Sequence, residues 1–206
     1  MTGARVAFQH ISSANSVALI RAGKARGAAV HAEATPHHLA LTQDDVLTYG
    51  VNARMNPPLR TEQDRQALIA GLADGTIDMI ATDHAPHSAE EKAKGLRGSA
   101  MGVVGIETAF PLLYTYLVET GKMPLEMLID RMADAPRRRF RIDGGMQVGD
   151  KAAVTVFDLH AQEKIDPNNF LSKGRATPFE GWEVHAACRL TICGDKIAYN
   201  ALSRKE

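Results

Sequence analysis

Ile80-Ala81-Thr82-Asp83-His84-Ala85-Pro86-His87 is the stretch of sequence that decides the fold. It continues the short apolar run of residues 77–81 and leads directly into one acid and two histidines. An apolar run that ends on Asp-His-x-x-His is typical of a buried strand that delivers polar groups at its carboxyl end. In an α/β barrel that end carries the chemistry. Because carboxylate oxygen and imidazole nitrogen are the ligands of hydrolytic zinc, the stretch predicts a barrel-type metal site.

Two more strands are predicted upstream, and each one also ends on polar residues. Residues 5–9 are interpreted as a short strand that ends at His10, and residues 28–34 as a second strand that ends before His37. The carboxyl ends of parallel strands share one edge of a sheet. We therefore expect His10, His37 and Asp83 to converge on one face.

Helices are predicted between these strands. Ser12 or Ser13 can cap a helix that Gly27 stops, and Thr61 can cap another that Gly75 closes. A long irregular stretch with paired prolines separates the second strand from the second helix. The repeated order of strand and helix predicts an α/β fold with a parallel sheet.

The second half of the chain changes in character. Residues 88–105 predict a glycine-rich, charged loop that acts as a mobile lid, and residues 106–118 predict a helix. From residue 143 onward, glycine turns separate short strand-like runs. We therefore expect two domains, an α/β unit over residues 1–142 and a small, mostly β module over residues 143–206.

Composition limits the class of protein. The 206 residues carry a formal net charge of zero, which suggests no nucleic-acid partner, and no apolar run is long enough for a membrane span. The start of the chain has no secretory apolar region. Cys188 and Cys193 could pair, but two free thiols in a cytoplasmic protein are the favoured interpretation. The basic run of residues 137–141 is interpreted as a solvated helix end.

Several motifs together resemble the amidohydrolase superfamily, and specifically its zinc-dependent dihydroorotases. They follow the order of that family over nearly the whole chain, and Asp-His-Ala-Pro-His is specific for cyclic amidohydrolases. The matching segments are His10-Ile11-Ser12, Thr35-Pro36-His37-His38-Leu39, Asn56-Pro57-Pro58-Leu59-Arg60, Ala81 to His87, Gly105-Ile106-Glu107-Thr108-Ala109 and Pro178-Phe179-Glu180-Gly181-Trp182.

The resemblance implies a (β/α)₈ barrel with a small β-sandwich built from both chain ends. The strands that end at His10, Thr35 and Asp83 would be the sixth, seventh and eighth of the barrel. The chain would then be the C-terminal part of the barrel followed by the sandwich module. The front half, with the remaining metal ligands and the arginine for the substrate carboxylate, is expected to be missing.

The resemblance also implies an activity. Dihydroorotases hydrolyse dihydroorotate reversibly to N-carbamoyl-L-aspartate, in de novo pyrimidine (UMP) biosynthesis, with two zinc ions in the complete site. Asp83 matches the aspartate that binds one metal and acts as the general base, and His10 matches a zinc ligand on the sixth strand. Without the resemblance, Asp83 would be interpreted as a helix cap or loop carboxylate, and His10 as an ordinary hydrogen-bonded histidine.

Substrate contacts follow from the same resemblance. His87 matches the position that contacts the substrate carboxylate, Asn56 matches a substrate-binding amide, and Met101 and Gly102 match a lid whose backbone contacts the substrate ring. The alternatives are a solvent-facing lid histidine and turn chemistry before Pro57. His37, His38 and His84 are assigned no metal and are expected to orient ligands or fill the end of the barrel.

Other functions stay open at this point. A related cyclic amidohydrolase, such as a hydantoinase or allantoinase, is one alternative. Another is a non-catalytic dihydroorotase-like scaffold for aspartate transcarbamoylase. His10 and Asp83 serve different metals in the family, and one protein ligand per metal does not make a tight site. We therefore expect the chain alone to be inactive and to oligomerise, aggregate or require a partner.

Overall fold

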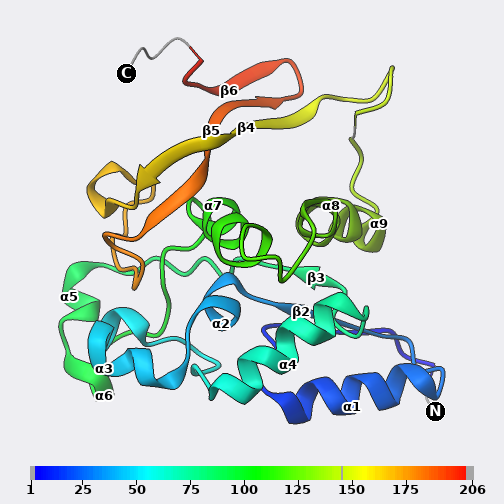
Figure 1. Cartoon of the computed structure of the whole chain (residues 1–206), viewed down its shortest axis with the longest axis horizontal. Coiled ribbons are helices and arrows are strands. Elements are labelled where there is room, and N and C mark those ends of the chain that lie inside the picture. The colour runs from blue at the N-terminus through cyan, green and yellow to red at the C-terminus, as the bar shows by residue number, and fades with distance from the viewer. Residues whose placement is uncertain (1–2, 145, 203–206) are drawn as a thin grey trace.

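Two three-stranded sheets organise the molecule, one parallel and one antiparallel. The computed structural model describes residues 3–144 and 146–202. The parallel sheet lies among helices in the first part of the chain, and the antiparallel sheet lies across helices α7 to α9 on the other side (Figure 1). Helices α5 to α9 separate the last strand of the first sheet, which ends at Ile80, from the second sheet, which begins at Ala153.

The parallel sheet has the strand order β1-β2-β3. Its strands are β1 (Val6–Phe8), β2 (Val30–Ala34) and β3 (Met79–Ile80). Val6 pairs with Val30, and Glu33 pairs with Met79. Because all three strands run in the same direction, their carboxyl ends meet at one edge, as the sequence predicts.

Helices follow each strand of this sheet. Those of the first hundred residues are α1 (Ala14–Ala25), α2 (Pro36–Ala40), η1 (Gln43–Asp45), α3 (Val46–Tyr49), η2 (Gly50–Ala53), α4 (Glu62–Ala73), α5 (Ala89–Lys92) and α6 (Gly95–Gly98). The later ones are α7 (Ala109–Leu113), the π-helical η3 (Tyr114–Val118), α8 (Leu125–Ile129), the π-helical η4 (Asp130–Asp134) and α9 (Ala135–Phe140).

The two long helices begin at the caps that the sequence predicts. The Ser13 side chain accepts a hydrogen bond from the Ser16 amide at the start of α1. Thr61 and Asp64 form a reciprocal capping box at the start of α4. Asp64 also accepts a hydrogen bond from the Ala14 amide at 2.8 Å, so one carboxylate joins the starts of both helices.

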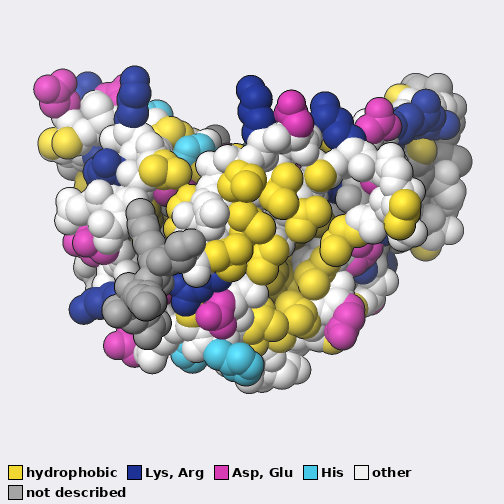
Figure 2. Space-filling model, turned by 90° about the horizontal axis from the view of Figure 1, so that it is seen from above, with side chains coloured by type: hydrophobic (Ala, Val, Ile, Leu, Met, Phe, Trp, Pro, Cys, Tyr) yellow, Lys and Arg dark blue, Asp and Glu magenta, His cyan; other side chains and the backbone are white. Residues whose placement is uncertain are grey.

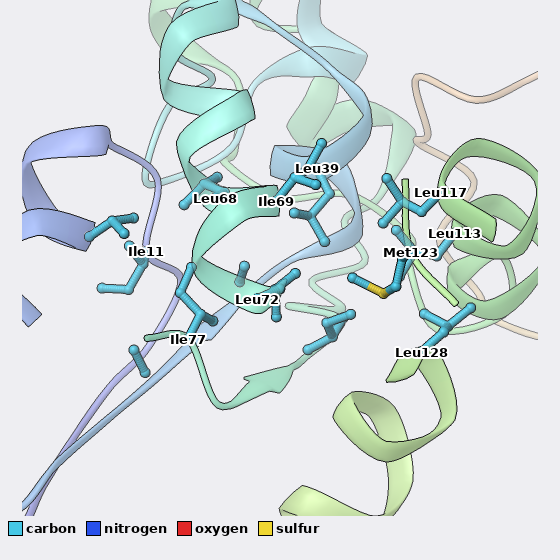
Figure 3. Close-up of a cluster of buried hydrophobic side chains, with 14 of the residues drawn as sticks. Ile11, Leu39, Leu68, Ile69, Leu72, Ile77, Leu113, Leu117, Met123 and Leu128 are labelled. Atoms are coloured by element: carbon cyan, nitrogen blue, oxygen red, sulfur yellow. The ribbon is translucent and has the colours of Figure 1, made fainter. Parts of the chain in front are cut away.

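A buried apolar cluster holds the parallel sheet against its helices. In Figure 3, Leu68, Ile69 and Leu72 of α4 lie at the centre of the labelled side chains, with Leu113 and Leu117 approaching from the later helices. Burial of this many aliphatic side chains is the main favourable term for folding. The cluster therefore fixes the strands whose ends carry the polar residues.

The antiparallel sheet is formed by β4 (Ala153–Lys164), β5 (Glu183–Cys193) and β6 (Lys196–Asn200), with η5 (Pro167–Asn169) before β5. The predicted hairpin turn at Gly194 joins β5 to β6, and Gly194 has a φ of +65°, a conformation that glycine adopts without strain. Phe157 of β4 stacks on Phe110 of α7 with ring centroids 4.1 Å apart. This contact joins the antiparallel sheet to the helical layer.

The C-terminal segment also packs directly onto the α/β part. Phe179 is fully buried in a second cluster with Leu41, Met55 and Leu112, and Trp182 packs against the same cluster. The Trp182 indole N–H donates to the Tyr49 hydroxyl at 2.9 Å. Both aromatic residues therefore lie between the C-terminal segment and the α/β part.

One face of the antiparallel sheet is apolar and only partly covered. The cross-strand partners Val154 and Ile192, and Val156 and Leu190, lie on this face, and Ile197 of β6 pairs with Ile192. We call these five residues the outer face. Ile197 is 63% exposed and Val156 is 40% exposed. Figure 2, which looks onto the molecule from the side of this sheet, shows hydrophobic side chains gathered in one broad area.

Three predicted elements differ from the structure. The expected loop of residues 88–105 contains the short helices α5 and α6, because Ser88 and Glu91 form a capping box. The helix expected over residues 106–118 begins at Ala109 and ends as a π-helix. Strand β3 is shorter than the apolar run of residues 77–81 that predicts it, because only Met79 and Ile80 pair with β2. Within the described residues, no helix is long and apolar enough to cross a membrane.

Candidate active site

His10 and Asp83 meet at the carboxyl ends of β1 and β3. His10 Nε2 lies 3.3 Å from Asp83 Oδ1. Both residues have left-handed backbone angles, with φ of +56° at His10 and +47° at Asp83. Such angles are uncommon outside glycine and cost of order 1 kcal/mol or more, so they persist where the surrounding structure imposes them. The fold therefore turns both side chains toward each other at the point where the strands end.

Glu33 and His37 complete this cluster from β2 and α2. His10 Nδ1 lies 3.1 Å from Glu33 Oε1, and His37 Nε2 lies 3.8 Å from Asp83 Oδ2. Among the described side chains, His37 Nε2 is buried without a hydrogen-bond partner, whereas His10 Nδ1 and Glu33 Oε1 face each other as an ion pair. Buried polar atoms without partners are rare in stable proteins and point to a missing ion, water or ligand. We call His10, Glu33, His37 and Asp83 the strand-end cluster.

Sequence reasoning missed Glu33. Its signal was present, because an acid lies within residues 28–34, a run otherwise interpreted as a buried strand. A charged residue in a strand of a parallel sheet is unusual, since such strands are covered on both faces. The register that pairs Phe8 with Ala32 brings Glu33 beside His10.

Burial governs the protonation of the cluster. It raises the pKa of Asp83, although the nearby His10 acts in the opposite direction. Burial also raises the pKa of Glu33, again opposed by His10. Burial lowers the pKa of His37 well below its ordinary value, so this imidazole is neutral at pH 7. A neutral imidazole and a carboxylate can each bind a metal ion.

The strand-end cluster contains the two candidate metal ligands, His10 and Asp83. His10 and Asp83 offer one nitrogen and one oxygen donor, and the unpartnered His37 Nε2 beside Asp83 fits a bound cation. Among the described side chains, however, no group of three or more His, Cys, Asp or Glu is arranged to hold an ion. A catalytic zinc typically takes three protein ligands. His10 and Asp83 alone are therefore fewer donors than such a site takes.

The histidines to which we assigned no metal are held by the surrounding chain. His38 Nε2 donates to the Pro57 carbonyl at 3.0 Å, and its Nδ1 lies 2.7 Å from the Thr35 hydroxyl. Burial lowers the pKa of His38 to about 4. His84 Nδ1 accepts hydrogen bonds from the amides of Gly105 and Ile106 at 3.2 and 3.3 Å. These contacts tie the loops after each strand to the sheet.

Two of the candidate substrate residues lie on these loops. Asn56 is exposed and immediately precedes Pro57, the residue that His38 holds. His87 Nε2 donates to the Met101 carbonyl at 3.0 Å, and its Nδ1 lies 3.6 Å from Glu91 Oε2. No described hydrogen bond or ion pair of His87 reaches the strand-end cluster. The structure thus brings together the two candidate metal ligands and, as a separate group, His87 with the lid.

Met101 and Gly102 form the part of the lid that His87 contacts. Met101 is 49% exposed. Gly102 has a φ of +147°, and a Cβ atom there would lie 2.6 Å from the Ala85 Cβ and 2.7 Å from the Ala85 carbonyl oxygen. A larger residue therefore does not fit, which explains a glycine at this position.

Comparison with known proteins gives a consistent result. The model of the amidohydrolase family matches residues 4–198. A dihydroorotase from Anoxybacillus flavithermus (strain DSM 21510 / WK1) is 52% identical over 199 residues, which are 96% of this chain and 46% of that protein. A dihydroorotase from Bacillus cereus (strain AH820) is 51% identical over 191 residues, covering 92% of this chain and 45% of that protein.

A solved structure shows the same architecture. The L-hydantoinase (dihydropyrimidinase) from Arthrobacter aurescens aligns with a TM-score of 0.90 at 31% identity, over 97% of this chain and 46% of that one. The chain therefore spans about half the length of the curated relatives and of the solved structure that it matches.

Proposed function

The chain belongs to the amidohydrolase family, and we propose that it provides the C-terminal half of a dihydroorotase. The observation that carries this proposal is the meeting of His10 and Asp83 at the ends of two parallel strands. Identities of 51% and 52% to dihydroorotases, over more than nine tenths of the chain, support this substrate class. The reaction would be the reversible hydrolysis of dihydroorotate to N-carbamoyl-L-aspartate, in pyrimidine biosynthesis.

The proposal extends to the architecture. Strands β1, β2 and β3 would be the sixth, seventh and eighth strands of a (β/α)₈ barrel. Residues 1–142 would form the barrel part, and residues 143–206 a small β-sandwich module. A cytoplasmic location belongs to the same proposal and is supported by the free thiols of Cys188 and Cys193.

The chain's own residues would have distinct roles. His10 and Asp83 would hold the metal, for which we propose zinc, together with ligands from the front half. A bound metal of this kind lowers the pKa of water and so supplies a nucleophile at neutral pH. Water adds to the ring amide carbonyl, the C–N bond breaks, and the leaving nitrogen takes up a proton. Asp83 would accept the proton from water and return it to that nitrogen.

Substrate binding would involve the loop residues. Asn56 would hydrogen-bond to the polar edge of the ring, since an amide both donates and accepts. His87 would contact the substrate carboxylate, and the backbone of Met101 and Gly102 would contact the ring. The buried neighbours of the two metal ligands, Glu33 and His37, would orient them.

We propose that the chain is inactive alone and requires a front half. The edge strand β1 supports this, because its residues Val6 and Phe8 are 38% and 46% exposed, although the strand lies in the sheet that carries the site. An open sheet edge of this kind is a template for pairing with another strand. The partly covered outer face offers a second apolar surface for the same partner.

Two other functions have specific support. Hydantoinase activity is favoured by the structural likeness to the L-hydantoinase, at 31% identity. A non-catalytic scaffold for aspartate transcarbamoylase is favoured by the incomplete metal site. The higher identity to dihydroorotases places both behind the main proposal.

The decisive experiment is reconstitution. The full 206-residue chain would be co-expressed with the front half of the Anoxybacillus dihydroorotase, and hydrolysis of dihydroorotate and of hydantoin would be measured with added zinc. We expect dihydroorotate turnover that requires both halves and is lost in Asp83→Asn. The matched control is Asp195→Asn in the exposed β5–β6 turn, which should keep the activity.

Each outcome decides between the proposals. Turnover of hydantoin without dihydroorotate would replace the main proposal by the hydantoinase. A complex that forms but hydrolyses neither compound would favour the scaffold. Activity of the single chain, abolished by Asp83→Asn, would contradict the need for a front half.

A further inference from the structure

Four consecutive backbone carbonyls of the lid each accept a hydrogen bond from a cationic or imidazole side chain. The donors are Arg54, His87 and Lys92, which we call the carbonyl clasp. Arg54 Nη1 donates to the Ser99 carbonyl, Lys92 Nζ donates to those of Ala100 at 3.1 Å and Gly102 at 3.0 Å, and His87 Nε2 donates to that of Met101 at 3.0 Å.

Lys92 is the buried member of the clasp. Its side chain belongs to a residue that is 4% exposed, and its ammonium makes no described ion pair. A third contact joins Nζ to the Arg54 carbonyl at 3.4 Å. Burying a charge without a counter-ion is costly unless its donors are satisfied. Here three carbonyl oxygens take that role, so the lysine's position and that of the lid depend on each other.

The placement of Lys92 is itself fixed by α5. The helix begins at the capping box of Ser88 and Glu91, and Lys92 is its last residue. The Glu91 carbonyl accepts the Ala100 amide at 3.0 Å, and the Arg54 carbonyl accepts the Gly102 amide at 2.9 Å. Both faces of the 99–102 backbone are therefore bonded to the same small group of residues, which leaves the segment little freedom.

We infer that Lys92 is a positioning residue, which holds the 99–102 backbone so that Met101 fixes the ring of His87 and the Met101–Gly102 backbone faces the substrate. The Met101 carbonyl can only accept, so His87 must carry a proton on Nε2, and this bond fixes the orientation of the ring. The substrate role in this inference rests on the proposed function. The mechanical role of Lys92 does not.

The test compares two identical substitutions in the full chain. Lys92→Met removes the ammonium and keeps most of the side-chain volume, and Lys94→Met makes the same change at an exposed position two residues away. Amide hydrogen exchange would be measured at Ala100 and Gly102, with the Ala81 amide, which bonds to the Ala34 carbonyl, as the internal reference. The tautomer of His87 would be read from its imidazole nitrogen resonances.

We expect Lys92→Met to accelerate exchange at Ala100 and Gly102 about tenfold or more, with Ala81 unchanged, because local opening no longer breaks bonds to a charged donor. The His87 resonances should lose the signature of a single Nε2-protonated form. Lys94→Met should change neither. In the reconstituted enzyme, Lys92→Met should raise KM about tenfold and leave kcat within a factor of about two.

Other results would overturn the inference. Unchanged exchange at Ala100 and Gly102 would show that Lys92 does not hold the lid. Equal acceleration at Ala81 would show a general loss of stability. If Lys92→Met does not fold, Lys92→Gln, which keeps an N–H donor, should fold and show a smaller acceleration of exchange. If neither variant folds, Lys92 is needed for the stability of the whole chain, and the inference fails. The exchange and tautomer results do not require activity, so they stand apart from the proposed function.

Discussion

The two sheets of this molecule are equal in strand number and opposite in their surroundings. In the parallel sheet, β3 and most of β2 are buried beneath helices, and the strand ends carry the candidate site. In the antiparallel sheet, one face packs on α7 through Phe157, and the outer face stays partly open. The same apolar residue should therefore contribute more to the free energy of unfolding in the parallel sheet than on the outer face of the antiparallel sheet.

The two sheets also differ in the kind of surface that they leave uncovered. The parallel sheet has its own apolar cluster but has an open edge at β1, and the described side chains at its strand ends do not include a group of three metal donors. The antiparallel sheet contributes no residue to the strand-end cluster, yet it exposes an apolar face. Each sheet therefore has a surface for which we propose a partner, an open edge in the parallel sheet and an apolar face in the antiparallel sheet.

The largest loss of stability is expected when isoleucine is replaced by threonine in the parallel sheet, and the same replacement at Ile197 of the antiparallel sheet serves as the comparison. Ile80→Thr in β3 places a hydroxyl where the isoleucine is 5% exposed and lies in the main apolar cluster. We expect a loss of about 2–4 kcal/mol in the free energy of unfolding, from lost packing and a buried hydroxyl. Urea denaturation monitored by circular dichroism measures it. A loss below about 1 kcal/mol would show that this cluster is loosely packed.

A pH effect should distinguish the buried end of the parallel sheet. The pKa of His38 is about 4 in the folded chain, below its ordinary value of 6.5. Between these values the unfolded state binds the proton more readily, so stability present above pH 6.5 is lost as the pH falls toward 4. From pH 6.5 to 5 the loss due to this residue should be about 1.5 kcal/mol.

The measurement compares urea unfolding of the wild type and of His38→Gln at pH 6.5 and 5. The gap in stability between the two proteins should shrink as the pH falls, because the variant has no imidazole to protonate. His160→Gln, at an exposed position of β4, serves as the control. If the difference in stability between the two proteins is the same at both pH values, His38 does not take up its proton between pH 6.5 and 5, and the prediction is wrong.

The smallest effect on stability is expected at Ile197. Ile197→Thr in β6 repeats the substitution made at Ile80, at a position that is 63% exposed on the outer face. The free energy of unfolding should change by less than about 0.5 kcal/mol. Self-association of the chain, measured by sedimentation velocity, should decrease, because the exposed apolar area is reduced. Destabilisation as large as that of Ile80→Thr would mean that the outer face is covered in solution.

The sequence was most informative where local chemistry and strand ends coincide. Helix α1 begins at Ser13 and helix α4 at Thr61, because each cap is decided by the residues next to it. The meeting of His10 with Asp83 followed from the parallel order of the strands. The caps depend on short segments of chain, and the meeting of the two side chains depends only on neighbouring strands running in the same direction.

Features that depend on register or on distant packing were not predictable. Glu33 joins the cluster because of the pairing between β1 and β2, which alternation within one strand does not specify. Lys92 lies in the charged segment Glu90-Glu91-Lys92, which predicts exposure, and its burial is decided by the lid folding over it. Trp182 packs against the α/β part through contacts with Tyr49 and Tyr116, which lie far away in sequence.

The left-handed backbone at His10 and Asp83 has a consequence for protein engineering. A glycine at either position would relieve of order 1 kcal/mol of conformational energy and would remove the imidazole or the carboxylate. A selection for thermal stability alone would therefore favour the loss of these two side chains. Directed evolution of this chain needs a selection for function at every round, because at these two positions stability and chemistry favour different residues.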